Sequence, residues 1–361
     1  MNIAEAFPVG EYIADELEAR GWSRSDLAEI LQRPPQFVSE IITGKKELTR
    51  ESAAQIAAAF GTSVELWLNL QDQYKLWAQS KDEDLQRNLN DVERRARLND
   101  FAPIAELRRR GVVTSSSVDE QEAEVIELFG VRDMTEKPSF LAAARRSNED
   151  EQATKLQCTW LALAMRKARA LDPLPEYDPR GFTEFAAGLS SLVSAPEAFA
   201  ELPDRFRQFG VGLVFEGNLP GGKIDGASFL AHGHPVIGLS GRGKRLDKVL
   251  FTLLHEVGHV INGDVQSDEP LLDVALSDTS PTALEARERR ADESAAKMIL
   301  PHGPAEPPNG QIRHPWIEAE ARHQGVHPIV VVGQLQARGL IAWKTSLVRG
   351  APTVDQHLAR W

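Results

Sequence analysis

Apolar residues at the start of the chain recur at the spacing of amphipathic helices. Within residues 1–80 they lie three or four positions apart, and Gly, Ser or Pro residues separate the segments that contain them. The helices are expected at Glu11–Arg20, Ser25–Leu31 and Gln36–Thr43, with a fourth starting near Thr49 and a fifth capped by Thr62 and Glu65. The tight turn between the second and third helices predicts a helix-turn-helix.

The next region, residues 81–200, keeps the helical spacing but carries many more charged residues. Acidic and basic side chains are mixed through residues 81–100, a pattern typical of a solvated helix or linker. Pro173, Pro175 and Pro179 predict a break in the helical region. We therefore expect a largely helical middle region.

The pattern changes at about residue 205, where short apolar runs separated by glycine-rich turns predict strands. They are expected at Gly210–Phe215, Ala227–Ala231 and Pro235–Leu239. A strongly apolar helix follows, with Asp247 as its expected N-cap and Asn262 and Gly263 at its end. The fold class predicted for the whole chain is mainly α with a small β-sheet (α+β).

Composition narrows the class of protein. The chain has 361 residues, of which 42% are hydrophobic and 26% charged, as in ordinary globular proteins. It shows no signal peptide and no apolar stretch of membrane-spanning length, and its single cysteine, Cys158, excludes an internal disulfide. We expect a cytoplasmic protein with no membrane partner, in which Cys158 is buried. The net charge of −12 argues against broad, nonspecific binding to nucleic acid but allows a small DNA-reading module.

The apolar helix contains a candidate metal site, the pentad HEVGH at residues 255–259. Residues four apart lie on one face of a helix, so the imidazoles of His255 and His259 can converge on one metal ion. Glu256 would lie close enough to act on a water bound to that ion. The alternative is a buried helix with two ordinary histidines, but a buried Glu256 would then need a partner.

A hydrolytic metal site needs a third protein ligand, and residues 282–301 offer one on a predicted helix. The spacing of Glu288 and Asp292 lets Glu288 reach the metal while Asp292 accepts a hydrogen bond from a ligating histidine. Glu285 is a competing ligand, although a capping box with Thr282 explains it as well.

These segments, RLDKVLFTLLHEVGHVINGD and ERRADESAAKMILP, resemble the ImmA/IrrE family of metallopeptidases, and the likeness covers roughly residues 200–340. The resemblance implies a zincin-like domain with His255, His259 and Glu288 as metal ligands and Glu256 as the catalytic base. Two positions depart from the family pattern. Arg290 stands where a second acid is often found, and Ser294 stands where a bulkier residue is usual.

Chemistry then predicts zinc as the metal, with manganese also compatible, and hydrolysis of a peptide bond. Glu256 would take a proton from water and deliver it to the leaving amine. No second oxyanion donor is evident, and His232, His234 and Arg242 are the candidates near the sheet. An extended substrate could add to the sheet edge near residues 227–239.

The first 80 residues resemble the xenobiotic-response-element type of helix-turn-helix, in particular HigA-like antitoxins. The resemblance implies DNA contacts from Gln36, Phe37, Ser39 and Glu40 in the major groove, with Lys45 and Lys46 near phosphate. It also implies a homodimer. Against DNA binding, residues 1–80 contain seven Lys and Arg against twelve Asp and Glu. The alternative is a domain that serves dimerisation or partner binding.

Two functions follow from the sequence. In the first, a DNA-binding head is joined to a zinc endopeptidase that cuts a protein partner, either a repressor or a toxin. In the second, the protein is a non-enzymatic HigA-like antitoxin and transcriptional repressor whose metal site is vestigial. The predicted division is a helix-turn-helix at 1–80, a helical middle at 81–200, the metallopeptidase domain at 201–305 and a C-terminal helical subdomain at 306–361.

Overall fold

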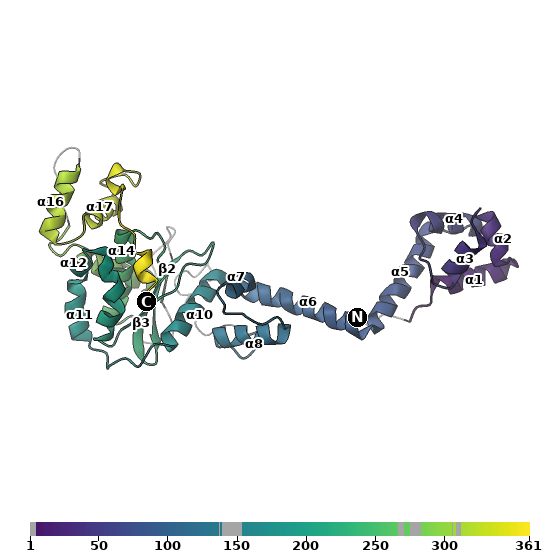
Figure 1. The fold of residues 1–361 in the computed structure, drawn as a ribbon, viewed down its shortest axis with the longest axis horizontal. Helices are drawn as coiled ribbons and strands as arrows, with labels where there is room; N and C mark the ends of the chain where they lie inside the picture. The colour runs from purple at the N-terminus through teal and green to yellow at the C-terminus, as the bar shows by residue number, and fades with distance from the viewer. Residues whose placement is uncertain are drawn as a thin grey trace. The chain divides into compact units, whose positions relative to one another are not determined.

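The computed structural model describes residues 5–136, 138, 154–265, 271–274, 283–304, 306–307 and 312–361, and of residues 271–274 and 283–285 only the backbone. These residues form two compact units, Met1–Ala96 and Arg97–Trp361, and the boundary between them falls within helix α6, Glu83–Phe101. Each unit is described by itself (Figure 1). The four-part division expected from the sequence stays a prediction.

The N-terminal unit is helical throughout its packed part. Its helices are α1 Val9–Arg20, α2 Arg24–Ile30, α3 Pro35–Ile42, α4 Arg50–Phe60 and α5 Val64–Lys81. Buried apolar residues from each helix meet in one core that includes Ile13, Leu27, Ile41, Ile56 and Trp67. The short connection between α2 and α3 confirms the predicted helix-turn-helix.

Helix caps in this unit follow the sequence signals with one exception. Ser23 caps α2 through a capping box with Asp26, three residues later. The prediction that Thr62 caps α5 is wrong, because the hydroxyl of Ser63 accepts the hydrogen bond from the Leu66 N–H. The Thr62 hydroxyl instead accepts a 2.7 Å hydrogen bond from the indole N–H of Trp67. The two residues are adjacent, and the hydrogen bond from Trp67, five residues along the chain, decides between them.

Helices of the C-terminal unit surround a small sheet. Before the sheet lie α7 Ile104–Arg109, α8 Val118–Phe129, α10 Lys155–Arg169, α11 Pro179–Ala187, α12 Leu189–Leu192, the 3₁₀ helix η1 Pro196–Glu201 and α13 Leu202–Arg207. After the third strand come α14 Leu246–Ile261, α15 Ala283–Ile299, α16 His314–Gln324, α17 Pro328–Ala337, η2 Ser346–Val348 and α18 Asp355–Leu358.

The described residues form one four-stranded sheet in the order β1-β3-β2-β4. Its strands are β1 Gly212–Phe215, β2 Ile224–Ala231, β3 His234–Leu239 and β4 Leu271–Val274. β1 pairs with β3 in parallel, and β2 pairs antiparallel with β3 on one side and β4 on the other. The three predicted strands are confirmed, as is the α+β class, whereas β4 was not predicted from the sequence.

This topology narrows the expectation that a substrate adds to the sheet near residues 227–239. That expectation needed a free edge at β2 or β3, but β3 lies between β1 and β2, and β4 occupies the other side of β2. The outer strands are β1 and β4. β4 pairs with residues 224–228, so a peptide could pair with that part of β2 only by replacing β4.

Side chains alternate between the two faces of the sheet, as the two-residue period of a strand requires. On one face, Leu213, Ile237 and Leu239 join a core built with α14. On the other, Ala227, Phe229 and Val236 join a core built with α10. The sheet therefore separates α10 from α14, and the β2 residues that alternate with Ala227 and Phe229 face the helix that carries the pentad.

Two further expectations have a direct outcome. Cys158 is buried, as predicted, and burial raises the pKa of its thiol to about 12. Within the described ranges, none of the helices has the length and hydropathy needed to span a membrane.

Candidate metal centre

All five residues of the pentad are buried in α14. This helix begins after Arg245, so the prediction of Asp247 as N-cap is wrong, because Asp247 lies in the first turn and forms a bidentate ion pair with Arg245. The helix ends at Asn262 followed by Gly263, which adopts a positive φ of 70°. The sequence signals therefore located the end of the helix more accurately than its start.

Both histidines of the pentad turn the same ring nitrogen toward one point. The Nε2 atoms of His255 and His259 lie 3.1 Å apart, and the two residues are 4% and 1% exposed. Glu288 reaches the same point from α15, with Oε2 3.1 Å from Nε2 of His255 and Oε1 3.6 Å from Nε2 of His259. The structure thus brings together the three residues predicted as metal ligands.

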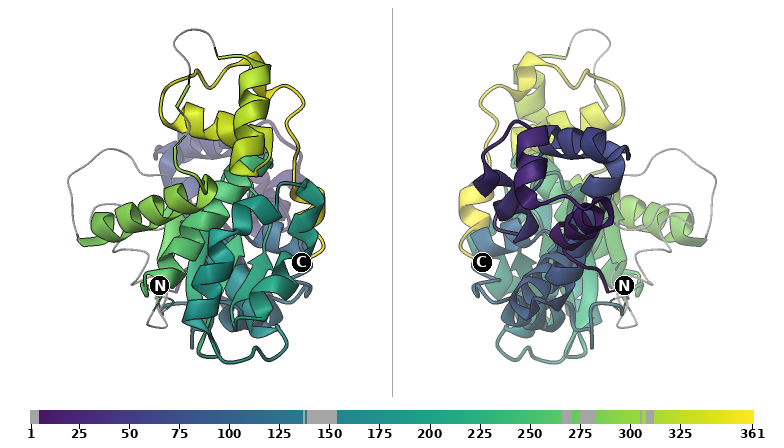
Figure 2. Two further views of the ribbon diagram at one scale, coloured as in Figure 1. Left: turned by 90° about the vertical axis from the view of Figure 1, so that its left-hand side faces the viewer. Right: turned by 90° about the vertical axis from the view of Figure 1, so that its right-hand side faces the viewer.

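A close approach of two helices makes this meeting possible. α15 packs along α14, as Figure 2 shows. A Cβ atom on Gly258 would lie 2.9 Å from the carbonyl oxygen of Ala291 in α15, so only glycine fits at this position without a shift of the backbone. Gly258 lies between the ligand histidines, and Ala291 lies three residues after Glu288. The glycine therefore permits the spacing that Glu288 needs.

The three donors fit a metal ion. Two imidazole nitrogens and a carboxylate oxygen, all within 4.8 Å of one another, form a His-His-Glu group able to hold a cation. In tetrahedral coordination at about 2.0–2.1 Å, neighbouring donor atoms would be separated by about 3.3 Å. The measured separations of 3.1, 3.1 and 3.6 Å lie around that value. This arrangement supports a metal ion without specifying which one.

Each histidine is oriented by a second carboxylate on its other ring nitrogen. Nδ1 of His255 lies 2.8 Å from Asp292, the partner predicted from the sequence. Nδ1 of His259 lies 3.1 Å from Asp264, which the sequence reasoning missed. Little in the sequence pointed to Asp264, because it follows the helix and its position is set by the turn. In that turn the N–H of Asp264 donates to the carbonyl of His259. Glu285, the competing ligand, lies outside the residues whose side chains are described, as does Thr282.

Titration of these groups follows from their close packing. Burial alone would lower the pKa of His259, but its hydrogen bonds to the carboxylates of Asp264 and Glu288 and the nearby carboxylate charges outweigh burial and raise this pKa to about 9. Burial alone would raise the pKa of Glu288, but its hydrogen bonds with both histidines lower it to about 2. A metal ion would compete with the protons held here, so its affinity should depend on pH.

Glu256 lies on the side of α14 that faces the sheet. Glu256 is fully buried. The hydroxyl of Ser228 on β2 donates a 2.5 Å hydrogen bond to Oε2 of Glu256 and lies 3.2 Å from the Glu256 carbonyl oxygen. A Cβ atom on Gly226 would lie 2.8 Å from Oε1, so a side chain there would require the Glu256 carboxylate to shift. Two β2 residues on the same face therefore shape the position of the predicted catalytic carboxylate.

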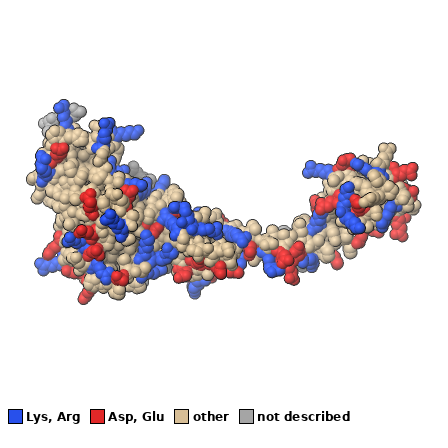
Figure 3. Space-filling view, in the orientation of Figure 1, with Lys and Arg blue, Asp and Glu red and all other residues tan. Residues whose placement is uncertain are grey.

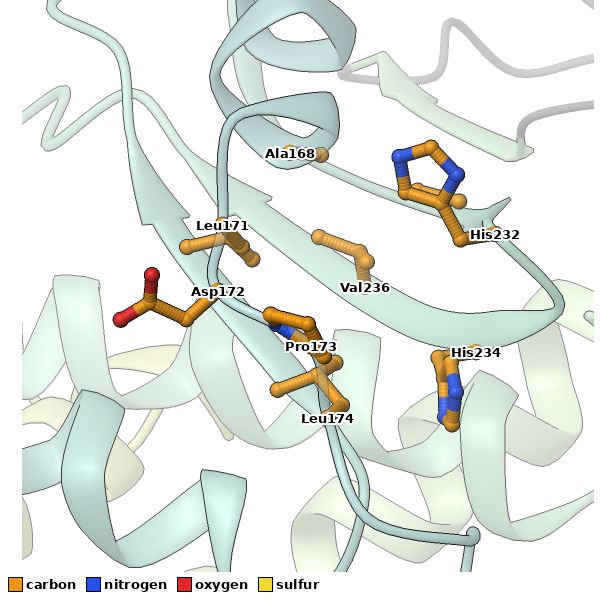
Figure 4. Close-up of a pocket in the computed structure, with 9 residues that line it drawn as sticks. Ala168, Leu171, Asp172, Pro173, Leu174, His232, His234 and Val236 are labelled. Carbon is orange, nitrogen blue, oxygen red and sulfur yellow. The ribbon is translucent and has the colours of Figure 1, made fainter.

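The three residues considered as oxyanion donors lie in two places: one is in an ion pair, and the other two line a pocket. Arg242 pairs with Asp225 through contacts of 3.0 and 3.1 Å. His232 and His234 lie at the turn between β2 and β3, where they line a pocket of about 280 Å³ with apolar neighbours such as Val236 (Figure 4). The nine residues that line this pocket include no predicted metal ligand.

The residues predicted to read DNA lie on and beside α3. Gln36, Lys45 and Lys46 are exposed, and Phe37, Ser39 and Glu40 are half-buried. Gln36 donates a 2.7 Å hydrogen bond to Glu40, and Nζ of Lys46 lies 4.8 Å from the ring centre of Phe37. Of the four predicted contact residues on α3, Gln36 alone is exposed, and its amide is engaged by Glu40, while the two exposed lysines follow the helix.

Two family models match the chain. The helix-turn-helix model matches residues 13–67, and the model of the IrrE N-terminal-like domain, a peptidase family, matches residues 207–314. The chain joins a helix-turn-helix domain to an IrrE-like peptidase domain. The second match includes β1–β3, α14 and α15, so the His-His-Glu group lies inside the IrrE-like domain. The resemblances drawn from the sequence are confirmed, and the match together with the His-His-Glu group suggests a metallopeptidase that uses a metal ion.

Relatives of the helix-turn-helix domain include an HTH-type transcriptional regulator of Haemophilus influenzae, 34% identical over 98 residues, which are 27% of this chain and 92% of that protein. The HTH-type transcriptional regulator YddM of Escherichia coli is 32% identical over 87 residues, 24% of this chain and 93% of that protein. A crystal structure of a hypothetical protein from E. coli shares 32% identity over 24% of this chain and 89% of that chain, with a TM-score of 0.23. Each of these relatives matches about a quarter of this chain.

In the IrrE-like domain, the structure gives partners to both residues that depart from the expected family pattern. Arg290 donates a 2.9 Å hydrogen bond to Asp264. Ser294 lies 3.4 Å from the amide oxygen of Asn262, close to the end of α14. Both side chains extend from α15 to the turn after α14, so neither departure disrupts the predicted ligands.

Proposed function

We propose that this protein is a cytoplasmic regulator in which a zinc-dependent endopeptidase domain hydrolyses a peptide bond in a protein partner, either a repressor or a toxin-like protein. The observation that carries the proposal is the convergence of His255, His259 and Glu288 on one point, beside the buried carboxylate of Glu256. Two nitrogens and one oxygen leave a fourth tetrahedral position for solvent or substrate, as in catalytic rather than structural zinc sites. The IrrE-like family match supports the same assignment.

His255, His259 and Glu288 would hold the ion, and Asp292 and Asp264 would keep the two imidazoles in the tautomer that presents Nε2. A bound divalent ion supplies Lewis acidity, which polarises the scissile carbonyl and lowers the pKa of the attacking water. Glu256 accepts the proton from that water and then donates it to the leaving amine nitrogen. The hydroxyl of Ser228 holds the Glu256 carboxylate during both transfers.

Replacing Glu256 by Gln tests this proposal. The amide keeps the size of the side chain but cannot take a proton, so peptide cleavage should fall by about 10²- to 10⁴-fold while zinc content stays at the wild-type level. The assay follows casein and the proteins encoded by adjacent genes by gel electrophoresis and mass spectrometry. Glu293→Gln, the same change at an exposed position of α15, is the matched control and should cleave normally.

Equal cleavage by Glu256→Gln and the wild type would remove Glu256 from the mechanism. Absence of cleavage by both, with zinc bound, would favour the second function, a non-enzymatic repressor of the antitoxin type. The relatives, which are HTH-type transcriptional regulators, fit either function. The two functions share the DNA-binding head and differ in the role of the metal site.

For the head, we propose sequence-specific DNA binding as a homodimer, with α3 in the major groove. Gln36, Phe37, Ser39 and Glu40 would contact base edges, and Lys45 and Lys46 would contact phosphate. Support comes from the helix-turn-helix match and from the exposure of Gln36, Lys45 and Lys46. Gln36 would exchange its hydrogen bond with Glu40 for a bidentate contact to adenine.

A further inference from the structure

Arg290, Asp264 and His259 form a continuous chain of polar contacts beside the proposed metal ligands. Oδ1 of Asp264 accepts a 2.9 Å hydrogen bond from Arg290, and Oδ2 lies 3.1 Å from Nδ1 of His259. The two oxygens of one carboxylate are thus divided between a guanidinium and an imidazole. Since His259 presents its other nitrogen to His255 and Glu288, the chain ends at the proposed metal position.

The other ligand histidine is oriented in a different way. The side chain of Asp292, which faces His255, is 59% exposed, whereas that of Asp264 is 4% exposed. A buried carboxylate costs free energy unless it is paired, and a planar guanidinium is well suited to pair it. Arg290 supplies that pairing from α15, two residues beyond Glu288, so it links the helix of the third ligand to the turn that carries Asp264.

We propose that Asp264 and Arg290 are positioning residues, which together hold the imidazole of His259 with Nε2 directed at the metal. This inference rests on the proposed metal site but not on catalysis. The backbone N–H of Asp264 donates to the carbonyl of His259, which fixes one end of the residue, and Arg290 fixes the other. Without Arg290, the carboxylate is free to rotate away from Nδ1, and His259 loses the contact that sets its tautomer and direction.

Replacing Arg290 should change the affinity for a divalent cation in opposite directions, depending on whether Arg290 positions His259 or acts only through its charge. Removing a positive charge near the site would by itself tighten the binding of a divalent cation, because it removes Coulomb repulsion. Loss of a positioning contact would weaken binding, because the ligand is no longer preorganised. Arg289 provides the matched control, since it is the next residue along, is exposed, and has no partner among the residues that the structure describes.

The experiment measures the affinity of the full chain for Zn²⁺ by competition with a chromophoric chelator, in the wild type and in Arg290→Ala, Arg289→Ala and Asp264→Ala. We expect Asp264→Ala to bind zinc about 10- to 100-fold more weakly and Arg290→Ala up to about tenfold more weakly. Arg289→Ala should bind as tightly as the wild type or slightly more tightly. Arg290→Lys keeps the charge but not the planar fork and should fall between Arg290→Ala and the wild type.

Circular dichroism of each metal-free variant establishes that it is folded, and the Arg290→Lys comparison remains informative if Asp264→Ala does not fold. Equal zinc affinities for Arg290→Ala and Arg289→Ala, or tighter binding by Arg290→Ala, would overturn the positioning role and leave the proposed metal site intact. A wild-type chain that binds no zinc would overturn the metal site itself, and this inference with it. Because no cleavage assay is involved, loss of catalysis by the wild type would affect neither result.

Discussion

At the scale of single residues, Ser228 has a role that the sequence does not reveal. Ser228 is fully buried on β2, and its hydroxyl donates a 2.5 Å hydrogen bond to the Glu256 carboxylate. A hydrogen bond to a charged group is worth about 1.5–3 kcal/mol, enough to hold a carboxylate in one rotamer. Ser228 therefore helps to determine where the proposed catalytic base points.

Replacing Ser228 by Ala should lower kcat for peptide cleavage by about tenfold, with KM and zinc content unchanged, because the carboxylate loses a positioning donor. Steady-state kinetics and metal analysis provide the readout. Ser240→Ala is the matched control: Ser240 is also buried, but its hydroxyl donates to the carbonyl of Ile224 and does not contact Glu256. Matching kcat values for the two variants would show that Ser228 does not position the base.

Residues that share a helical spacing were the ones the sequence could predict. His255 and His259 are four apart on one helix, and Glu288 and Asp292 are four apart on another, so periodicity alone relates the members of each pair. Asp264 was missed because a turn, rather than a helical period, brings it back to His259. Ser228 was missed because its contact joins a strand to a helix across 28 positions of sequence.

At the scale of elements, the helices of the N-terminal unit and the first three strands follow the local patterns because caps, glycines and apolar periodicity all agree. Errors occur where a nearby side chain competes with the capping signal, as at Thr62, engaged by Trp67, and at Asp247, engaged by Arg245. β4 was not predicted because a four-residue strand between charged residues has little local signal. Its place in the sheet comes from pairing with β2, far earlier in the chain.

Gly258 illustrates a feature that appears only when two elements meet. Within the pentad its lack of a side chain has no evident role, and a helix interior disfavours glycine by about 1 kcal/mol relative to alanine. In the structure, the missing Cβ is what lets α15 pass close to α14 at Ala291. The local cost is offset by the placement of Glu288 opposite the two histidines.

At the scale of the whole molecule, the chain combines an acidic surface with a proposed DNA-binding head. Figure 3 shows acidic and basic side chains intermixed on the visible face of the N-terminal unit. The net charge of the chain is −12. Long-range attraction to DNA should therefore be weak, and binding should depend on a small number of local contacts around α3.

A fluorescence titration of the full chain with DNA from upstream of its own gene tests the head domain. Binding should weaken linearly in log–log plots against salt concentration, and Lys46→Ala should reduce the magnitude of the slope by about 1, because one phosphate contact is lost. Gln36→Ala should lower the preference over a scrambled sequence by about 1–3 kcal/mol. Lys81→Ala, at the end of α5, is the control and should leave both unchanged. A flat salt response would count against docking in a groove.

The measurement that most directly tests the central claim is anomalous diffraction from crystals grown with zinc, recorded on both sides of the zinc absorption edge. We predict one peak, about 2.0–2.1 Å from Nε2 of His255, Nε2 of His259 and a carboxylate oxygen of Glu288. Crystals of the His259→Ala variant, grown with zinc in the same way, should lack that peak. Wild-type crystals with no peak at this position, or with the Glu288 side chain directed into solvent and no other ligand in its place, would contradict the assignment of a metallopeptidase.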